Sequence, residues 1–244
     1  MPETSGSARN SQPSPAFVVV AWGGAAAFAA SLTLFLYAYL VRFGDVVAET
    51  GIRRPVGTDI LLFSVFALHH SLFARTPLKR WMQRIAPAEL ERSLYTWIAS
   101  ALFTAVCWWW MAVPGDFYTL TGAWRWAALL VQAIGLVLTF LGARALDVLD
   151  LAGVRSIQPA RSVPIPLVTS GAFAIVRHPL YLGWALFTFG APHMTPTRAL
   201  FAAISTAYLM LAIPWEERGL HRTFGAQYEV YRVKTRWRML PGVY

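Results

Sequence analysis

Runs of apolar residues about as long as a bilayer is thick are the feature that most restricts the fold of this chain. A helix that crosses the membrane needs about 20 mostly apolar residues. The sequence contains six apolar segments, at residues 16–41, 56–73, 94–113, 124–146, 180–191 and 199–215. Only 14% of its residues are charged, whereas soluble domains carry about 25%. The pattern predicts an all-α integral membrane protein with about five to six transmembrane helices.

The segments differ in length, and this difference divides the chain. The first, third and fourth are long enough to span, whereas the last two are short, separated by Pro192 and Pro196, and predict a short helical hairpin. Residues 77–86 place apolar side chains at helical spacing opposite basic ones, which predicts an amphipathic helix in the membrane interface. We therefore expect a disordered tail at 1–15, four transmembrane helices over 16–146, and a C-terminal region over 147–244 with the hairpin and a basic tail.

Positive charge is distributed unevenly between the loops. Lys and Arg gather between the second and third segments, between the fourth and fifth, and after the sixth, while residues 114–123 have neither. The positive-inside rule then places both termini and the basic loops on the cytoplasmic side of a membrane, taken here as a bacterial inner membrane. The net charge of +9 is thus accounted for by topology and lipid headgroups, and no nucleic-acid partner is expected.

The single cysteine, Cys107, excludes an intrachain disulfide and a thiolate metal cage. It lies within an apolar segment and is expected to be a small buried side chain. No metal site is predicted.

The stretch Arg177–His178–Pro179 enters the fifth apolar segment. Proline favours the first position of a helix, so a helix is expected to begin at Pro179. The start of a helix attracts anions, and Arg177 adds a positive charge beside it. Tyr181 and Gly183 follow one turn later, where glycine would let a ligand approach the backbone. A helix cap with an arginine reaching to lipid headgroups is the alternative interpretation.

Glu216 and Glu217 follow the sixth apolar segment directly. Ionisable groups at membrane depth are costly and usually functional. Adjacent helical residues point about 100° apart, so one glutamate can face a cavity while the other turns elsewhere. His221 is four residues beyond Glu217, a spacing that predicts a pair between them. A hairpin would bring the glutamates to Arg177 and His178, and such a site suits a zwitterionic, cationic ligand.

The segments "RHPLYLG", "EERGLHRTFGAQYEVYR" and "MLP" resemble the C-terminal cofactor region of a superfamily of membrane methyltransferases. Its members include isoprenylcysteine carboxyl methyltransferases, phospholipid methyltransferases, NnrU-like proteins and methanethiol S-methyltransferases. The stretch "LHHSLFARTPLKRWMQRIAPAELERSLYTWIAS" is most similar to the methanethiol S-methyltransferases and their NnrU-like relatives. Two residues depart from that pattern, since His69 and Ser156 stand where the family has glutamine.

The resemblance implies S-adenosylmethionine as the cofactor and a small apolar thiol as the acceptor, as in the conversion of methanethiol to dimethyl sulfide. The residues that it assigns to the cofactor are Arg177, His178, Pro179, Tyr181, Leu182, Gly183, Glu216, Glu217, Tyr228 and Arg232. The expected catalytic residues are His70, as base or thiol orienter, and Arg177. Candidates on the substrate side are His69, Ser71, Arg75 and Arg155.

Two other functions fit the same residues. The cofactor could serve a prenylcysteine carboxylate or a lipid amine, which would need an opening toward the bilayer. The chain could instead bind haem through His69 or His70, as a protein similar to zeta-carotene isomerase, and the two glutamates would then have no role. The oligomeric state cannot be predicted from these patterns.

Overall fold

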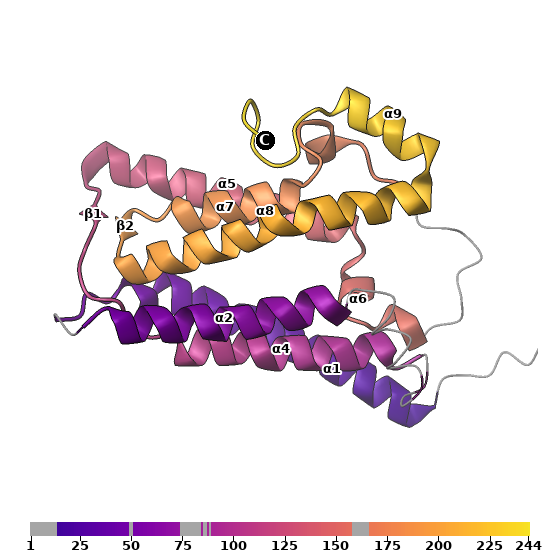
Figure 1. The fold of residues 1–244 in the computed structure, drawn as a ribbon, viewed down its shortest axis with the longest axis horizontal. Coiled ribbons are helices and arrows are strands. Elements are labelled where there is room, and N and C mark those ends of the chain that lie inside the picture. Colours follow the sequence, from indigo (N-terminus) through magenta and orange to yellow (C-terminus); the bar gives the residue numbers. More distant parts are fainter. Residues whose placement is uncertain (1–13, 49–50, 74–83, 85–86, 88, 158–165) are drawn as a thin grey trace, which may run out of the picture.

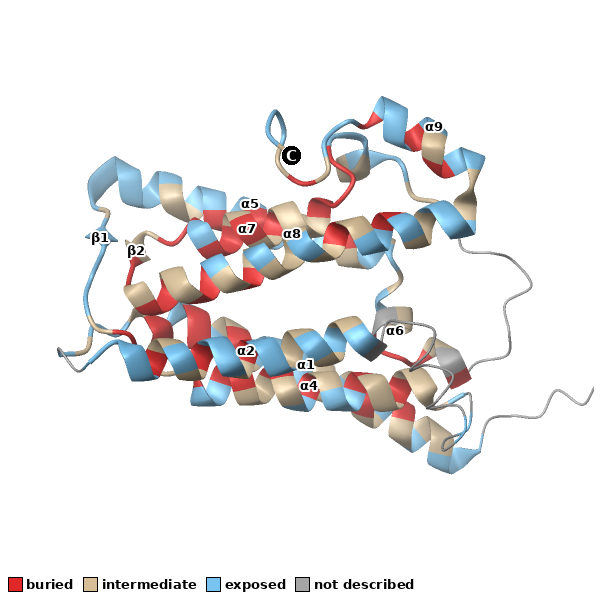
Figure 2. Ribbon diagram, viewed as in Figure 1, coloured by how far each residue is buried: buried red, intermediate tan, exposed pale blue. Residues whose placement is uncertain are grey.

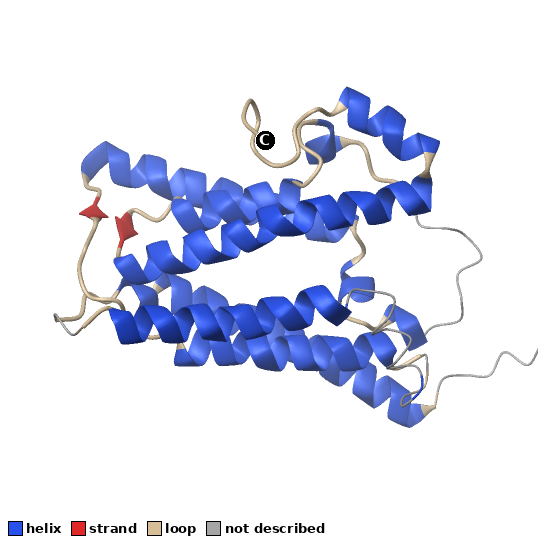
Figure 3. Ribbon diagram, viewed as in Figure 1, coloured by secondary structure: helices blue, strands red, loops and turns tan. Residues whose placement is uncertain are grey.

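The computed structural model describes residues 14–244 except 49–50, 74–83, 85–86, 88 and 158–165. The described chain is almost entirely helical (Figure 3). Six helices run along its long axis (Figure 1), namely α1 (Pro15–Leu40), α2 (Arg53–Phe73), α4 (Glu91–Trp109), α5 (Gly122–Ala145), α7 (Pro179–Phe189) and α8 (Pro196–Phe224). The six predicted helical segments are therefore confirmed as helices.

Shorter elements join the six helices. They are η1 (Arg42–Gly44), α6 (Val148–Leu151), η2 (Arg155–Ile157), η3 (Gly171–Ala174) and α9 (Ala226–Lys234). A two-stranded antiparallel ribbon, which the all-α prediction did not include, pairs β1 (Tyr118–Thr119) with β2 (His193–Met194). The predicted interfacial helix at 77–86 lies almost wholly outside the described residues, as does the predicted tail.

Among the described residues, three helical stretches are long and apolar enough to cross a membrane: Pro15–Gly44, Gly122–Ala145 and Pro196–Phe224. The prediction that the last hairpin is short is correct for α7 but wrong for α8, which continues through Pro214 to Phe224. The prediction for the third segment is not met by α4, because Glu91, Arg92 and several hydroxyl-bearing residues lower its hydropathy. The chain is an integral membrane protein, and three of its described helices meet this criterion for a span.

The helices form two layers, with α1, α2 and α4 on one side and α5, α7 and α8 on the other (Figure 1). Residues are buried inside each layer, where α5 packs on α7 and α1 packs on α4, and also where the two layers meet (Figure 2). An aromatic cluster fills that contact; its buried rings include Phe35, Tyr39, Phe43, Phe63, Phe103, Trp110, Phe187 and Phe201. Many large apolar side chains outside the cluster are exposed, as expected for surfaces that face lipid.

Helices α5 and α7 approach so closely that side chains are excluded from their contact. A Cβ atom at Gly135 would lie 2.3 Å from the Phe187 backbone nitrogen, and one at Gly183 would lie 2.6 Å from the Thr139 backbone nitrogen. Small residues at such crossings let two backbones pack directly in membranes. This contact fixes the short α7 against a long helix.

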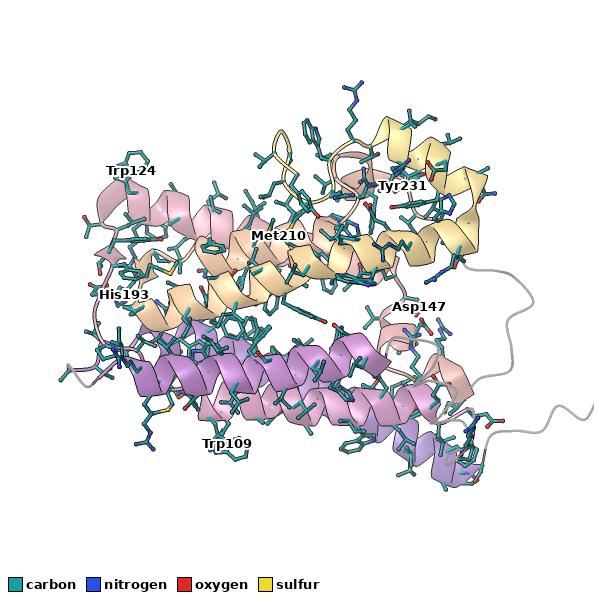
Figure 4. All side chains as sticks on the ribbon, viewed as in Figure 1. Trp109, Trp124, Asp147, His193, Met210 and Tyr231 are labelled. Carbon is teal, nitrogen blue, oxygen red and sulfur yellow. The ribbon has the colours of Figure 1, made fainter. Side chains whose placement is uncertain are left out.

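The two ends of the helix bundle differ in chemistry. At one end, Arg198 donates hydrogen bonds to the carbonyls of Tyr39 (3.0 Å), Leu40 (2.7 Å) and His193 (2.7 Å), which ties α8 to the end of α1. His193 also lies at that end, away from the predicted site (Figure 4). The opposite end holds the starts of α1, α4 and α7 and the ends of α2, α5 and α8 (Figure 1).

Candidate functional site

The core of the candidate site is an ion pair between the residue before α7 and the glutamate near the end of α8. Nε of Arg177 donates to Oε1 of Glu217 at 2.7 Å, and both residues are buried. The sequence-based prediction that a hairpin brings these two residues together is confirmed. Because a charge buried without a partner is strongly destabilising, each residue needs the other to stay at this depth.

The C-terminal segment 235–244 folds back over this ion pair, a feature that sequence reasoning missed. Nη1 of Arg177 donates to the carbonyls of Thr235 (2.7 Å) and Arg236 (2.8 Å). The backbone nitrogens of Arg177 and His178 donate to the carbonyls of Trp237 (2.9 Å) and Arg238 (2.8 Å). Arg177 therefore uses its side chain and its backbone N–H to bind Glu217 and the C-terminal segment. These contacts favour a positioning role over direct contact with a substrate.

Arg238 is the cation that the sequence analysis did not single out. Its Nε lies 3.3 Å from Oε2 of Glu217, and its side chain is about a third exposed. Its Nη1 donates to the Tyr244 hydroxyl at 3.2 Å. The residue could have been found only by knowing that the tail returns, since Arg238 lies 21 positions after Glu217 in a run of several basic residues.

His178 joins the two glutamates. Its Nδ1 lies 3.5 Å from Glu216 and its Nε2 lies 3.6 Å from Glu217. Burial alone would lower the pKa of His178, but the two nearby carboxylates outweigh it, and the net pKa is raised. Its ring stacks on that of Tyr181 at 5.3 Å, and the Tyr181 hydroxyl donates to Glu216.

The two glutamates face different surroundings, as their adjacent helical positions predict. The side chain of Glu216 is 47% exposed, whereas that of Glu217 is 10% exposed. Glu216 is therefore the carboxylate that a ligand can reach. The predicted pair between Glu217 and His221 is wrong, because α9 turns back and places Glu229 3.0 Å from His221.

Of the two site residues predicted on α9, the structure brings only one to the ion pair. Tyr228 is buried beside Arg177 and Glu217, and burial raises the pKa of its hydroxyl to about 12. Arg232 is exposed and pairs with Glu229 at 2.9 Å. Tyr231, also on α9, donates to the carbonyl of Phe173 and so anchors this helix over η3 (Figure 4).

The structure gives two further predicted residues packing roles. Gly183 faces α5 rather than an open site, so its missing side chain serves the helix contact and not a ligand. Leu182 packs with the apolar cluster that contains Ile213 and Met239, under the C-terminal segment. Pro179 is the first residue of α7, as predicted.

A second group of side chains lies at the end of α2, opposite the glutamates. Nδ1 of His70 is 2.6 Å from the hydroxyl of Tyr95 on α4. Ser71 and Tyr208 on α8 share a hydrogen bond of 3.1 Å, which links the two layers. Sequence reasoning named His70 and Ser71 but missed both tyrosines.

The remaining substrate-side candidates are His69, Arg75 and Arg155. The ring of His69 stacks on Tyr95 at 5.5 Å. Arg155 pairs with Asp147 at 2.9 Å beside α6. Arg75 lies outside the described residues.

The two groups meet across the contact between α2 and α8. Glu216 lies close enough to His70 for their charges to interact. Both side chains keep a large exposed surface, so a ligand can reach them. This part of the molecule combines an accessible carboxylate, aromatic rings and a histidine, and could hold a cationic ligand beside a group that loses a proton.

Comparison with known proteins gives one consistent set of relatives. Methanethiol S-methyltransferase 2 of Bradyrhizobium diazoefficiens is 34% identical over 220 residues, which cover 84% of this chain and 83% of the relative. Methanethiol S-methyltransferase of Mycobacterium tuberculosis is 33% identical over 84% of this chain and 90% of its own length. Nurim of Xenopus laevis is 26% identical over 70% of this chain and 64% of its own length. No family model and no solved structure matches the chain.

Proposed function

The chain belongs to the methanethiol S-methyltransferase family, and from this premise we propose that it transfers the methyl group of S-adenosylmethionine to a small thiol within the membrane. The observation that carries the proposal is the cluster in which Arg177, His178 and Arg238 surround Glu216 and Glu217. A haem ligand set would leave this cluster without a purpose.

The residues around Glu216 fit the chemistry of the cofactor. S-adenosylmethionine would supply an electrophilic methyl group carried on a sulfonium. Glu216 presents an accessible carboxylate for amino or ribose hydroxyl groups, and Tyr181 holds that carboxylate in place. The rings of Tyr181 and Tyr208 offer faces that attract a cation. Glu217 and Arg177 would not contact the cofactor but would position the residues that do, because their buried ion pair fixes the start of α7.

The acceptor side is built around His70. A thiol has a pKa of about 8.5 or higher, so at neutral pH it must lose a proton before it attacks. His70, which lies near Glu216, would accept or orient that proton, and the ring of Phe66 lies 5.7 Å from the His70 ring. An apolar wall favours methyl transfer to a thiolate, because water would stabilise the separated charges more than the transition state.

The orientation follows from charge. The end that carries the site also carries the basic residues of α9 and of the C-terminal segment. Arg42 lies at the other end of the bundle, but it donates to the carbonyls of Cys107 (2.6 Å) and Trp110 (3.3 Å), so its charge is used within the protein. The positive-inside rule then puts the site on the cytoplasmic side of the inner membrane.

The proposed function is tested with purified protein in detergent and S-adenosylmethionine labelled in its methyl group. Methanethiol, hydrogen sulfide and a prenylcysteine are supplied in separate reactions, and the volatile and extracted products are assayed for label. We expect label in dimethyl sulfide. The His70→Ala variant should turn over more slowly while it keeps its affinity for S-adenosylhomocysteine. Label in the carboxylate of the prenylcysteine in place of dimethyl sulfide would refute the thiol assignment.

A further inference from the structure

Tyr95 touches both histidines at the end of α2. Its hydroxyl oxygen is 2.6 Å from Nδ1 of His70, and its ring stacks on that of His69 with an interplanar angle of 14°. The ring of Phe66 also lies 5.7 Å from that of His70. The His70 ring is therefore held by neighbours, and its contact with Tyr95 leaves Nε2 as the nitrogen that can meet a thiol.

The hydrogen bond between Tyr95 and His70 admits two proton arrangements. If the phenol donates to Nδ1, the neutral ring carries its proton on Nε2 and cannot accept another one there. If Nδ1–H donates to the phenol oxygen, Nε2 keeps the lone pair that a base needs. We propose that Tyr95 is a positioning residue that holds His70 in this second arrangement, with Nε2 as the base for a small thiol. The inference rests on the proposed function.

Tyr208, the other tyrosine near His70, is less suited to this role. Its ring meets that of His70 edge-on at 6.3 Å, and its hydroxyl shares a hydrogen bond with Ser71. Within the part of the chain that the structure describes, the other titratable groups that act on His70 are His69 on its own helix and Glu216 on α8. Burial disfavours a positive charge on His70, and the charge of Glu216 offsets part of that cost when the ring takes the proton.

The proton and electrons balance without a further reactant. The S–H bond of the thiol breaks, and its proton moves to Nε2 of His70. The thiolate sulfur forms a bond to the methyl carbon while the bond from that carbon to the sulfonium sulfur breaks, and its electron pair stays on that sulfur. His70 then releases its extra proton to water, and Tyr95 keeps its own proton throughout.

The test compares wild type with Tyr95→Phe, a change that removes one hydroxyl and keeps the ring on His69. Each is assayed with ethanethiol and with trifluoroethanethiol, whose fluorines make the thiol more acidic and so less dependent on a base. We expect a loss of about tenfold or more with ethanethiol and a much smaller loss with the fluorinated thiol. Tyr39→Phe is the matched control, because it removes a buried hydroxyl bonded to the Thr188 carbonyl away from the site.

Two measurements without turnover accompany the assay. Calorimetry should give Tyr95→Phe the wild-type affinity for S-adenosylhomocysteine. In protein labelled with ¹⁵N-histidine, the Nδ1-protonated signal that His70→Ala removes should also be lost in Tyr95→Phe, because the ring no longer has a phenol oxygen to accept from Nδ1.

The outcomes separate this inference from the proposed function. Equal losses with both thiols, no loss with either, or weakened binding of S-adenosylhomocysteine in Tyr95→Phe would overturn the role of Tyr95 and leave the proposed function standing. A wild-type protein that methylates neither thiol would overturn both.

Discussion

Replacing Glu217 with glutamine removes the carboxylate that three cationic or ionisable side chains share. Arg177 lies 2.7 Å from it, Arg238 lies 3.3 Å from it and His178 lies 3.6 Å from it. Loss of one partner from a buried ion pair lowers the free energy of unfolding by about 3–5 kcal/mol. Arg177 keeps its hydrogen bonds to two backbone carbonyls, and glutamine keeps an oxygen acceptor, so we expect the lower end, about 3 kcal/mol.

The assay is unfolding in detergent, followed by tryptophan fluorescence. The matched control is Glu229→Gln on α9, which removes the same charge from an exposed position that pairs with Arg232 and His221. Exposed pairs contribute about 0–1 kcal/mol, so the control should unfold almost as wild type does. Equal stability of the two variants would refute the argument that the buried ion pair fixes the start of α7.

Three further outcomes are expected. Gly183→Leu should lower the yield of folded protein because a Cβ there meets the backbone of α5. Gly57→Ala should not lower it, because the space around Gly57 is open. Equal yields of the two variants in size-exclusion chromatography would contradict the close contact between α5 and α7. The stabilisation that His178 adds is measured as the difference in melting temperature between wild type and His178→Gln. This difference should be full below pH 6.5, the ordinary pKa of histidine, and should disappear as the pH rises through the raised pKa of His178. A difference that grows with pH would contradict the pairing of His178 with the glutamates. Arg238→Gln should weaken binding of S-adenosylhomocysteine and leave the ratio of turnover with two thiols unchanged, as measured by calorimetry and by the labelled-methyl assay.

The start of α7 could be predicted from the sequence because its determinants are local. Proline fixes its own backbone and lacks the N–H that the first turn would leave unbonded. Pro179 is accordingly the first residue of α7, and the buried cluster forms where the arginine and histidine precede it. The six helical segments could be predicted because their determinants are local too. An apolar run within one helix indicates that the helix is buried or faces lipid.

The end of α8 could not be predicted in this way. The predicted apolar segment stops at residue 215 because Glu216 and Glu217 follow it, and Pro214 removes one helical hydrogen bond just before that point. Helices in membrane proteins tolerate proline where neighbouring groups satisfy the freed carbonyl. Helix α8 therefore runs on to Phe224 and carries both glutamates on a continuous helix.

Long-range contacts account for the other differences. The return of residues 235–244 over Arg177 depends on backbone hydrogen bonds, which any sequence can make. The sequence alone suggested that a ligand approaches Gly183, because it does not show which element packs against this residue. Helix α5 occupies the space beside Gly183. Tyr95 lies 25 positions from His70 on another helix, so no spacing rule could connect them.

The central claim is that the junction of α7 and α8 binds the methyl donor, and titration calorimetry with S-adenosylhomocysteine tests it most directly. Wild type should bind, His178→Ala and Glu216→Gln should bind at least tenfold more weakly, which is about 1.4 kcal/mol, and Glu229→Gln should bind as wild type does. Unchanged affinity in both site variants, in protein that unfolds at the wild-type temperature, would contradict the claim.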